Sequence, residues 1–486
     1  MEIKTHHFKK VVKKEIADVS SRTFLSFLPP LFAALRQAAL SSFPDPEGAQ
    51  QYAAAIRAEV VARLPELLEE FERNATAHGA KVIWARTAGE ANDFILKLAR
   101  DRGVTYVTKG KSMVSEELGI NDVLSEQGIE PYETDLGEFI AQQLNRPPFH
   151  IVGPAVNISL EEICDLFMEK AGMQEPTTDP VELGYAARLF LRDKFHHLKM
   201  GIAGVNIAVA ETGSVMNVEN EGNIRLTKSS PEIQVSIMSL EKVVPTMLDA
   251  MHIMRVLCRN CTGQNMSAYV SIDTGPKKKD EIDGPEELYI VIVDNGRSNF
   301  YFDEKAREAL RCIRCGACLN NCPVYTSIGG YPYGWAYSGP MGQVLNPLLL
   351  GLDRTRDLYN ACTFCGACRA VCPGGVDHPS LFLYYRSKDV EGDPAFKGVR
   401  PGRWEQAMYA VATFLMAHPP LWRLASRLGR PFLNRSARGG VISELWGQFD
   451  GWFRNRDLPA MPARTFHQRW KELRKQSSGT TGTTDG

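Results

Sequence analysis

The chain has 486 residues, of which 44% are hydrophobic and 23% are charged, and its formal net charge is −1. This length predicts two or three domains, and the charge balance gives no indication of nucleic acid as a partner. The eleven cysteines are concentrated between positions 312 and 372, which argues against a disulfide framework and favours metal ligation in a reducing compartment.

The N-terminus, Met1–Ile16, is polar and basic and lacks the apolar core of a signal peptide. No run is expected to reach the length that spans a bilayer. The longest apolar stretch considered, Ala407–Ala417, ends at His418-Pro419-Pro420, and proline stops helices. We therefore expect no membrane span and a cytoplasmic location.

The predicted secondary structure changes along the chain. Residues 1–70 form a helical segment, with helices expected at Thr23–Ser41 and Gly48–Asn74. Residues 71–300 alternate between helices and short apolar strands, which predicts a mostly parallel sheet covered by helices. The expected strands are Lys81–Ala85, Val104–Thr108, Glu130–Glu133, Phe149–Val152, Gln234–Leu240 and Leu288–Val293, with a hairpin around Thr212-Gly213.

Three further segments complete the predicted organisation. Residues 301–390 hold most of the cysteines and form a double-cluster region. Residues 391–475 form a helical C-terminal region with several tryptophans. The tail, 476–486, has the composition of a disordered segment.

Eight cysteines fall into two copies of one spacing, C-x2-C-x2-C-x3-C followed by proline. The copies are Cys312, Cys315, Cys318 and Cys322 before Pro323, and Cys362, Cys365, Cys368 and Cys372 before Pro373. Each run can present three thiolates to one [4Fe–4S] cluster and supply its fourth to the other. Two clusters are therefore expected, one on Cys312, Cys315, Cys318 and Cys372, the other on Cys322, Cys362, Cys365 and Cys368.

The spacer between the two runs is longer than in compact ferredoxins and is rich in aromatic residues. Tyr331, Tyr333, Trp335 and Tyr337 are candidates to cover a cluster or simply to pack. The spacer favours an α-helical ferredoxin domain of the kind found in multi-subunit reductases. A purely structural role for the clusters remains the alternative, and zinc is disfavoured because its sites use paired knuckles. Cys258 and Cys261 form a lone C-x2-C, interpreted like Cys164 as ordinary buried thiols, with their role left open.

Neither of two common nucleotide-binding motifs, the P-loop and the dinucleotide-binding fingerprint, is present in the sequence. The string Lys109-Gly-Lys-Ser112 follows a predicted strand, but a P-loop needs glycine where Thr105 stands. No G-x-G-x-x-G follows a strand either, so a dinucleotide-binding fingerprint is absent from the sequence.

Several polar strings of the α/β region resemble the lactate-utilisation (LUD) domain family. They are K-S-M-V-S-E-E-L-G-I-N at 111–121, E-T-D-L-G-E at 133–138, A-E-T-G-S at 210–214, N-E-G-N at 220–223 and D-N-G-R-S at 294–298. Together with the two cysteine runs and the Trp-rich C-terminal segment, they make essentially the whole chain similar to the iron–sulfur proteins of that family.

This resemblance implies an α/β fold with a NagB/RpiA/CoA-transferase-like sheet domain, followed by an α-helical dicluster ferredoxin domain. It also implies two partner subunits, one rich in paired-cysteine motifs and one with a cluster-free LUD domain. The implied process is oxidation of L-lactate to pyruvate, with this chain transferring electrons rather than performing the substrate chemistry.

Candidate substrate-binding residues come from the polar strings. Lys109, Lys111, Arg225 and Arg297 are candidate carboxylate ligands, with Ser112 beside them. Glu211 is a candidate base or, by analogy with CoA-transferases, a nucleophile. The alternative is that these residues cap helices and stabilise turns. The catalytic residues are not identified by the sequence.

Three other functions remain open at this point. A glycolate or other 2-hydroxy-acid oxidase, or a heterodisulfide-type reductase, would use similar double-cluster domains. A CoA-transferase-like enzyme with structural clusters belongs to another class. A regulatory ligand-binding protein is weaker, because no DNA-binding element or basic patch is apparent.

Overall fold

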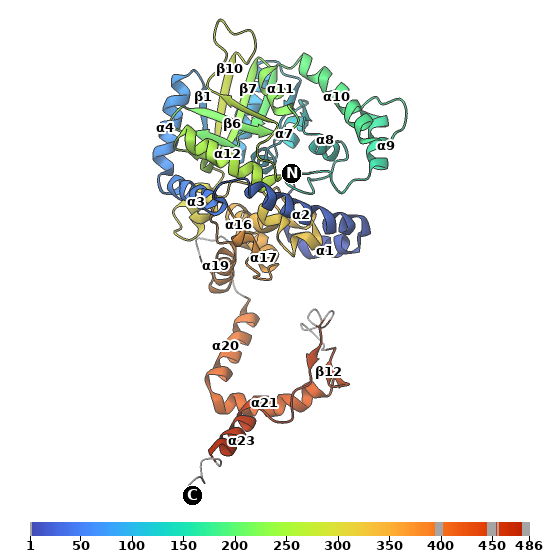
Figure 1. Ribbon diagram of the computed structural model, residues 1–486, viewed down its shortest axis with the longest axis vertical. Coiled ribbons are helices and arrows are strands. Elements are labelled where there is room, and N and C mark those ends of the chain that lie inside the picture. The colour runs from blue at the N-terminus through green and yellow to red at the C-terminus, as the bar shows by residue number, and fades with distance from the viewer. Residues whose placement is uncertain (1, 394–401, 445–452, 454–455, 479–486) are drawn as a thin grey trace. The chain divides into compact units, whose positions relative to one another are not determined.

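A computed structural model describes residues 2–393, 402–444, 453 and 456–478 (Figure 1). The chain divides into two compact units, Met1–Arg400 and Pro401–Gly486, which we describe separately.

Four helices open the first unit: α1 (Phe8–Ala17), α2 (Val19–Leu40), α3 (Pro46–Ala62) and α4 (Leu64–Ala77). Asp18 and Asp45 cap α2 and α3 by accepting backbone N–H groups of Ser21 and Gly48. The single helical run predicted at Gly48–Asn74 is two helices, because Pro65 lacks an N–H and starts a new helix after Arg63.

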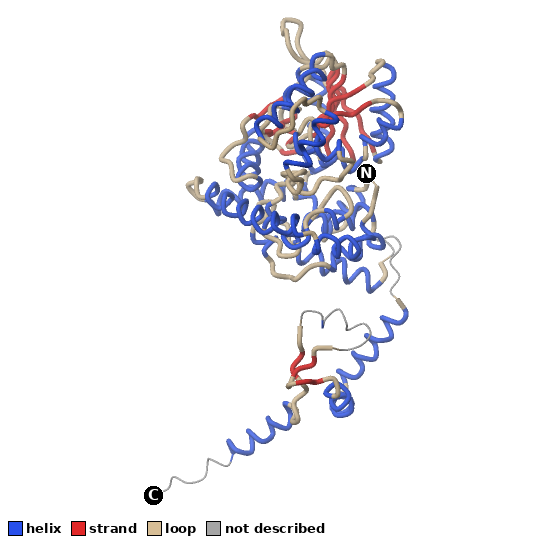
Figure 2. Tube along the Cα trace, turned by 90° about the vertical axis from the view of Figure 1, so that its right-hand side faces the viewer, coloured by secondary structure: helices blue, strands red, loops and turns tan. Residues whose placement is uncertain are grey.

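A six-stranded parallel sheet forms the centre of the next region, as the alternating sequence predicts. Its strand order is β1-β10-β7-β4-β2-β3, and every neighbouring pair is parallel. The strands are β1 (Lys81–Ala85), β10 (Glu287–Val293), β7 (Ile233–Ser239), β4 (Met200–Gly204), β2 (Tyr106–Lys109) and β3 (Glu130–Glu133). Figure 2 shows these strands in red among the helices that cover them. The α/β fold class is therefore confirmed.

The chain reverses direction across this sheet between β2 and β4. From β2 it moves to the edge strand β3, and from β4 it moves the opposite way through β7 and β10. In open parallel sheets, ligands bind outside the carboxyl ends of the strands at such a switch point. The loops that follow β2 and β4 therefore occupy the position where a binding site is expected.

Helices connect the strands, and several of them pack against the sheet. They are α5 (Ala88–Asp101), α6 (Met113–Leu118), α7 (Ile120–Glu126), α8 (Leu136–Gln143), α9 (Leu160–Lys170), α10 (Pro180–His196), α11 (Asn223–Ser229), α12 (Met247–Cys261) and α13 (Arg297–Tyr301). Ser112 caps α6 and Thr246 caps α12, each by accepting a backbone N–H of the first turn.

A smaller four-stranded sheet, in the order β8-β5-β6-β9, contains the predicted hairpin. Its strands are β8 (Val243–Val244), β5 (Ile207–Val209), β6 (Ser214–Glu219) and β9 (Tyr269–Asp273). Gly213 turns the hairpin at φ +67°, and a Cβ there would lie 2.1 Å from the backbone nitrogen of Ala75. Glycine is needed here for both its conformation and its size.

The strand predicted at Phe149–Val152 is wrong, because this segment is a loop. Pro147, Pro148 and Pro154 surround it, and proline cannot donate to a strand ladder. The Phe149 ring instead lies where a Cβ on Gly329 would be, 2.4 Å from its Cζ, so the loop packs against the cysteine-rich region.

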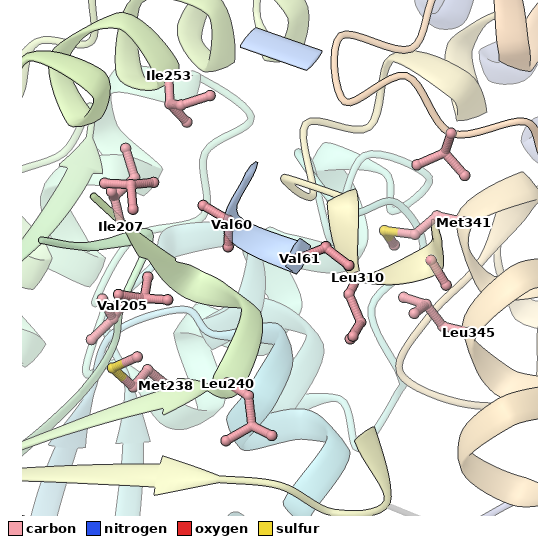
Figure 3. Packing of buried hydrophobic residues seen from close by; sticks show 14 of the residues in the cluster. Val60, Val61, Val205, Ile207, Met238, Leu240, Ile253, Leu310, Met341 and Leu345 are labelled. Carbon is pink, nitrogen blue, oxygen red and sulfur yellow. The ribbon is translucent and has the colours of Figure 1, made fainter. Parts of the chain in front are cut away.

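The cysteine-rich region is helical, as expected. Its main helices are η3 (Ala306–Arg311), α14 (Ala317–Asn320), α15 (Tyr325–Ile328), α16 (Gly339–Leu350), α17 (Leu352–Asn360), α18 (Ala367–Ala370) and α19 (His378–Glu391). A single hydrophobic core runs from the sheets through α3 into this region. Figure 3 shows Val60 and Val61 of α3 lying between Ile207 and Met238 on one side and Leu310 and Met341 on the other.

Helix α2 is the one helix among the described residues that is long and apolar enough, by length and composition, to cross a membrane. The expectation that no run reaches this length is therefore wrong. In this structure α2 packs against α12, α14 and α15. Its Arg36 donates hydrogen bonds to Asn260 Oδ1 at 2.7 Å and to Gln50 Oε1 at 2.9 Å.

The second unit contains α20 (Arg403–Ala417), α21 (Pro419–Asn434) and α23 (Phe466–Ser478). Three short antiparallel strands, β11 (Ala437–Arg438), β12 (Val441–Ile442) and β13 (Leu458–Pro459), were not expected from the sequence. Of the tail predicted to be disordered, 476–486, Gln476–Ser478 end α23, and the remainder lies outside the described residues.

A buried ionic network joins the sheet domain to the cysteine-rich region. Glu241, just after β7, binds Arg297 at 3.0 Å and Arg314 of the first cysteine loop at 2.6 Å. Arg297 also pairs bidentately with Glu117, at 2.8 and 2.7 Å, and the Tyr337 hydroxyl donates to the same carboxylate at 2.6 Å. Burial opposes the charge of Arg297, but Glu117 and Glu241 outweigh it and hold its pKa well above the usual value.

We expect the substitution Glu117→Ala to lower the free energy of unfolding by about 3–5 kcal/mol, because it leaves a buried guanidinium with one partner fewer. Denaturant unfolding of the cluster-loaded chain measures the loss. The control is Asp101→Ala, which breaks the exposed Asp101–Lys97 pair and should cost less than about 1 kcal/mol. Equal losses in the two variants would contradict a joining role for the network.

Candidate metal centre and adjoining cavity

The two cysteine runs fold into loops with the same backbone conformation. Arg314 and Gly316 have φ of 62° and 75°, and the matching residues Phe364 and Gly366 have 54° and 78°. In each loop a backbone N–H points at the first sulfur: Arg314 N lies 3.4 Å from Cys312 Sγ, and Phe364 N lies 3.3 Å from Cys362 Sγ. N–H groups directed at ligand sulfurs are a feature that tunes iron–sulfur sites.

The charge interactions among the eight thiols are those expected for two groups with the fourth cysteine exchanged. Burial raises the pKa of Cys318, and the neighbouring charges of Cys312, Cys315 and Cys372 raise it further. Burial likewise raises the pKa of Cys368, with Cys322, Cys362 and Cys365 adding to the effect. Cys318 also interacts with Cys368, so the two groups adjoin. This grouping supports the exchanged ligand sets, which we carry forward as a proposal.

The two groups differ in their exposure to solvent. In the first group, Cys315 and Cys318 are buried, whereas Cys365 of the second group is exposed. Tyr325 and Tyr333 of the aromatic spacer are fully buried. Burial raises the pKa of Tyr333, and the charges of Cys322 and Cys318 contribute to this shift. The spacer thus screens the junction of the groups from water, while the second group reaches the surface at Cys365.

Cationic side chains surround the first group. Arg57 is 2% exposed and, within the part of the chain that the structure describes, donates only to backbone carbonyls, those of Glu241, Leu310, Arg311 and Val243. Burial lowers its pKa to about 10, and the charges of Glu241 and Cys312 oppose that shift. Burial also lowers the pKa of Arg36, and the charges of Cys315 and Cys372 oppose that shift. A buried cation without a side-chain partner needs a counter-charge, and a thiolate-ligated cluster would supply one.

The residues present therefore fit iron–sulfur clusters. All eight thiols are free and none forms a disulfide. They are grouped in fours, receive backbone N–H groups and, at the first group, lie among cations. When bound, such clusters accept and release one electron at a time.

A cavity of about 260 Å³ lies at the switch point of the sheet, against the first cysteine loop. Lys111 and Ser112 enter it from the end of β2, Asn206 from the end of β4, and Lys242 from the end of β7. Arg314 of the cysteine loop also lines it. Its remaining walls include Ile151, Val152, Leu257, Cys258 and Cys261.

The apolar residues of the cavity wall lie close to the first cysteine loop. Leu257 belongs to the same small hydrophobic cluster as Cys315 and Ala317. A Cβ on Gly316 would lie 3.0 Å from the Cγ2 of Ile151. The cavity is thus bounded on one side by the sheet edge and on the other by the loop that carries the first thiol group.

The structure brings only some of the predicted substrate-binding residues together. Lys111 and Ser112 line the cavity, whereas Glu211 and Arg225 are exposed and do not line it. Glu211 Oε2 accepts the backbone N–H of Met247 at 2.9 Å, which is a role at the start of α12.

Lys109 and Arg297 lie in buried ion pairs away from the cavity. Lys109 Nζ is 3.0 Å from Glu116 and 2.7 Å from Glu133. These carboxylates, with Glu138, approach one another within 4.8 Å, in a geometry that could hold a metal ion. The ammonium of Lys109 already provides their counter-charge.

Lys242, Arg314, Cys258 and Cys261 were missed as cavity residues. Lys242 follows the predicted strand Gln234–Leu240, and a polar residue after the carboxyl end of a parallel strand is a usable signal. The position of Arg314 depends on how the cysteine loop docks, which no local pattern indicates. Burial raises the pKa of Cys261 to about 11.

Two family models match the chain, the LUD domain at residues 68–293 and the 4Fe-4S dicluster domain at residues 308–376. The chain is 37% identical to lactate utilization protein B of Bacillus velezensis, covering 98% of this chain and 99% of that protein. It is 36% identical to the uncharacterized electron transport protein YkgF of Escherichia coli, with the same two coverages. A crystal structure of a DUF162 family protein from Deinococcus radiodurans is 12% identical and covers 47% of this chain and 98% of that one, with a TM-score of 0.26.

The exchanged grouping predicts which cysteine substitutions act on the same cluster. Cys372→Ser and Cys315→Ser should perturb one and the same EPR signal of the reduced, anaerobically purified protein, because both thiols lie in the first group. Cys322→Ser should perturb the other signal, and Cys261→Ser should leave both signals and an iron content of about eight per chain unchanged. If Cys372→Ser altered the signal that Cys365→Ser alters, the exchange would be excluded.

The cations around the first group should raise its midpoint potential, so removing one of them should lower it. Arg36→Gln should lower the midpoint potential of the first group by about 50–100 mV, the effect of one charge roughly 8–15 Å away at an effective dielectric constant of about 20. EPR-monitored redox titration measures the shift. The matched control, Arg188→Gln on α10, removes an exposed arginine and should leave both potentials unchanged; an equal shift there would contradict a local effect.

Proposed function

Because this chain belongs to the lactate utilization protein B family, we propose that it is the electron-transfer subunit of a complex that oxidises L-lactate to pyruvate. An iron–sulfur electron-transfer role is supported by the dicluster match and by the electron transport name of one relative. The step from this role to L-lactate rests on the names of the other relatives.

The observation that carries the proposal is the pair of adjoining, exchanged thiol groups. A cluster that only stabilised the fold would not need a second one beside it, whereas two adjoining clusters form a path for single electrons. The path has a buried end, at Cys315 beside the cavity, and an exposed end, at Cys365. Electrons would enter at one end and leave at the other, with both ends fixed by one core.

The partners that this proposal requires are two further subunits of the lactate utilization system. One is rich in paired-cysteine motifs, and the other carries a LUD domain without clusters. We propose that the subunit that exchanges electrons docks where Cys365 is exposed, because the other seven ligand thiols are buried or only partly exposed. A cytoplasmic location, where thiols stay reduced, fits the eight free ligand cysteines.

Reconstitution of the complex with its partner subunits tests the proposal. Reduction of an artificial acceptor by L-lactate should fall to background when Cys315 or Cys365 is replaced by serine. Cys164→Ser, which changes a buried thiol on α9 outside both groups, is the matched control and should keep the wild-type rate. Undiminished activity of Cys315→Ser and Cys365→Ser would show that electrons do not pass through this chain.

Substrate profiling of the same wild-type complex separates L-lactate from related donors. L-lactate should give the highest kcat/KM among L-lactate, D-lactate and glycolate. A preference for glycolate would replace the proposed reaction by that of a related 2-hydroxy-acid oxidase, while leaving the electron-transfer role in place.

A further inference from the structure

We propose that the cavity at the switch point binds a small carboxylate, a 2-hydroxy or 2-oxo acid, with Lys111 and Lys242 as its anion-binding groups and the first cysteine loop as one wall. The proposal rests on the proposed function for the choice of acid. The cavity, the charges and the position of the loop stand on the structure alone.

Two lysines of the cavity lack a hydrogen-bond or ion-pair partner among the described residues. Lys111 and Lys242 line it, and within the described part of the chain neither side chain makes a hydrogen bond or an ion pair. The two lysines that are buried in this domain are both paired, Lys109 with Glu133 and Lys228 with Asp273. Since shielded ammonium groups are normally compensated, the unpaired lysines indicate an anionic ligand.

The carboxylates of the cavity are already used by the backbone. Asp135 accepts the N–H of Glu138 at the start of α8, and Glu219 accepts the N–H groups of Ile224 and Arg225 in α11. Glu221 accepts the N–H of Leu136, and burial together with the charge of Asp135 raises its pKa to about 7. Among the described residues none of these three carboxylates forms an ion pair with Lys111 or Lys242, so both ammonium groups remain available to a ligand.

The size and walls of the cavity select a small molecule. Its 260 Å³ lies below the range of roughly 300–1,000 Å³ typical of sites for drug-sized ligands. Ile151, Val152 and Leu257 offer an apolar wall for a methyl group. Asn206 uses its Oδ1 to accept the N–H of Val218, and its amide nitrogen has no partner among the described residues, so it can donate to a hydroxyl or keto oxygen.

Because the cavity adjoins the first cysteine loop, a ligand bound in it should affect the first thiol group. Arg314, which lines the cavity, lies between Cys312 and Cys315 and donates to the carbonyl oxygen of Cys312 at 3.2 Å. A carboxylate bound between Lys111 and Lys242 would place a negative charge beside this loop. Ligand binding should therefore alter the electronic signature of the first cluster and leave that of the second unchanged.

Equilibrium binding of pyruvate, L-lactate and inorganic phosphate to the cluster-loaded full-length chain tests the proposal. Pyruvate or L-lactate should bind saturably at one site per chain. Lys111→Gln should weaken this binding about tenfold to a hundredfold, the effect expected for one charge-assisted hydrogen bond. Lys111→Arg, which keeps the charge, should retain most of the affinity, and the control Lys97→Gln, an exposed lysine on α5, should bind like wild type.

A second measurement needs no variant of the cavity. Saturating pyruvate should shift the EPR signal that Cys315→Ser removes, and not the signal that Cys365→Ser removes. Absence of saturable binding, equal affinity for phosphate, or full binding by Lys111→Gln would each overturn the proposal. Lactate oxidation by the complex without carboxylate binding to this chain would overturn the cavity site alone, whereas binding without lactate oxidation would overturn the proposed function alone.

Discussion

The carboxylate of Glu241 is the point on which the arrangement of the site depends. It lies at the end of β7 and is shared between Arg297 of the sheet domain and Arg314 of the first cysteine loop. The charges of Arg297 and Arg314 hold the pKa of Glu241 at about 2 although burial works in the opposite direction. This carboxylate stays ionised, and it fixes the cysteine loop against the carboxyl edge of the sheet.

Positive charges outnumber negative ones around Glu241 and the first cysteine loop, which favours an anionic centre there. Glu117 and Glu241 balance Arg297 and Arg314, which leaves Arg57 without a side-chain counter-charge among the described residues. The protein alone thus carries excess positive charge beside the first thiol group, and the thiolates with their cluster would neutralise it. Folding of this joint and loading of the metal should consequently depend on each other.

Much of the fold was predictable because its signals are local. The alternation of apolar strands and helices predicted the parallel sheet, and the Thr212-Gly213 turn predicted the β5–β6 hairpin. The repeated cysteine spacing, which needs no knowledge of the fold, predicts two ligand sets, and these sets stay a prediction. The failures are non-local: Phe149–Val152 has the composition of a strand, but its prolines and its contact with Gly329 make it a loop. Lys109 and Arg297 look like ligand-binding residues in sequence, and only the structure shows that their charges are used internally.

The attachment of the first cysteine loop to the sheet through Glu241 also explains why a cluster domain and a LUD domain occur in one chain with one core. Were the cysteine loops on a flexible tether, their distance from the switch point would vary, and a charge bound in the cavity would have no fixed effect on them. Here Leu257 packs with Cys315, and Arg314 lines the cavity while bound to Glu241. The loop conformation that ligates the metal and the wall that closes the cavity are therefore one piece of backbone. If the cavity binds a ligand and the first thiol group holds a cluster, any coupling between the two would be reciprocal.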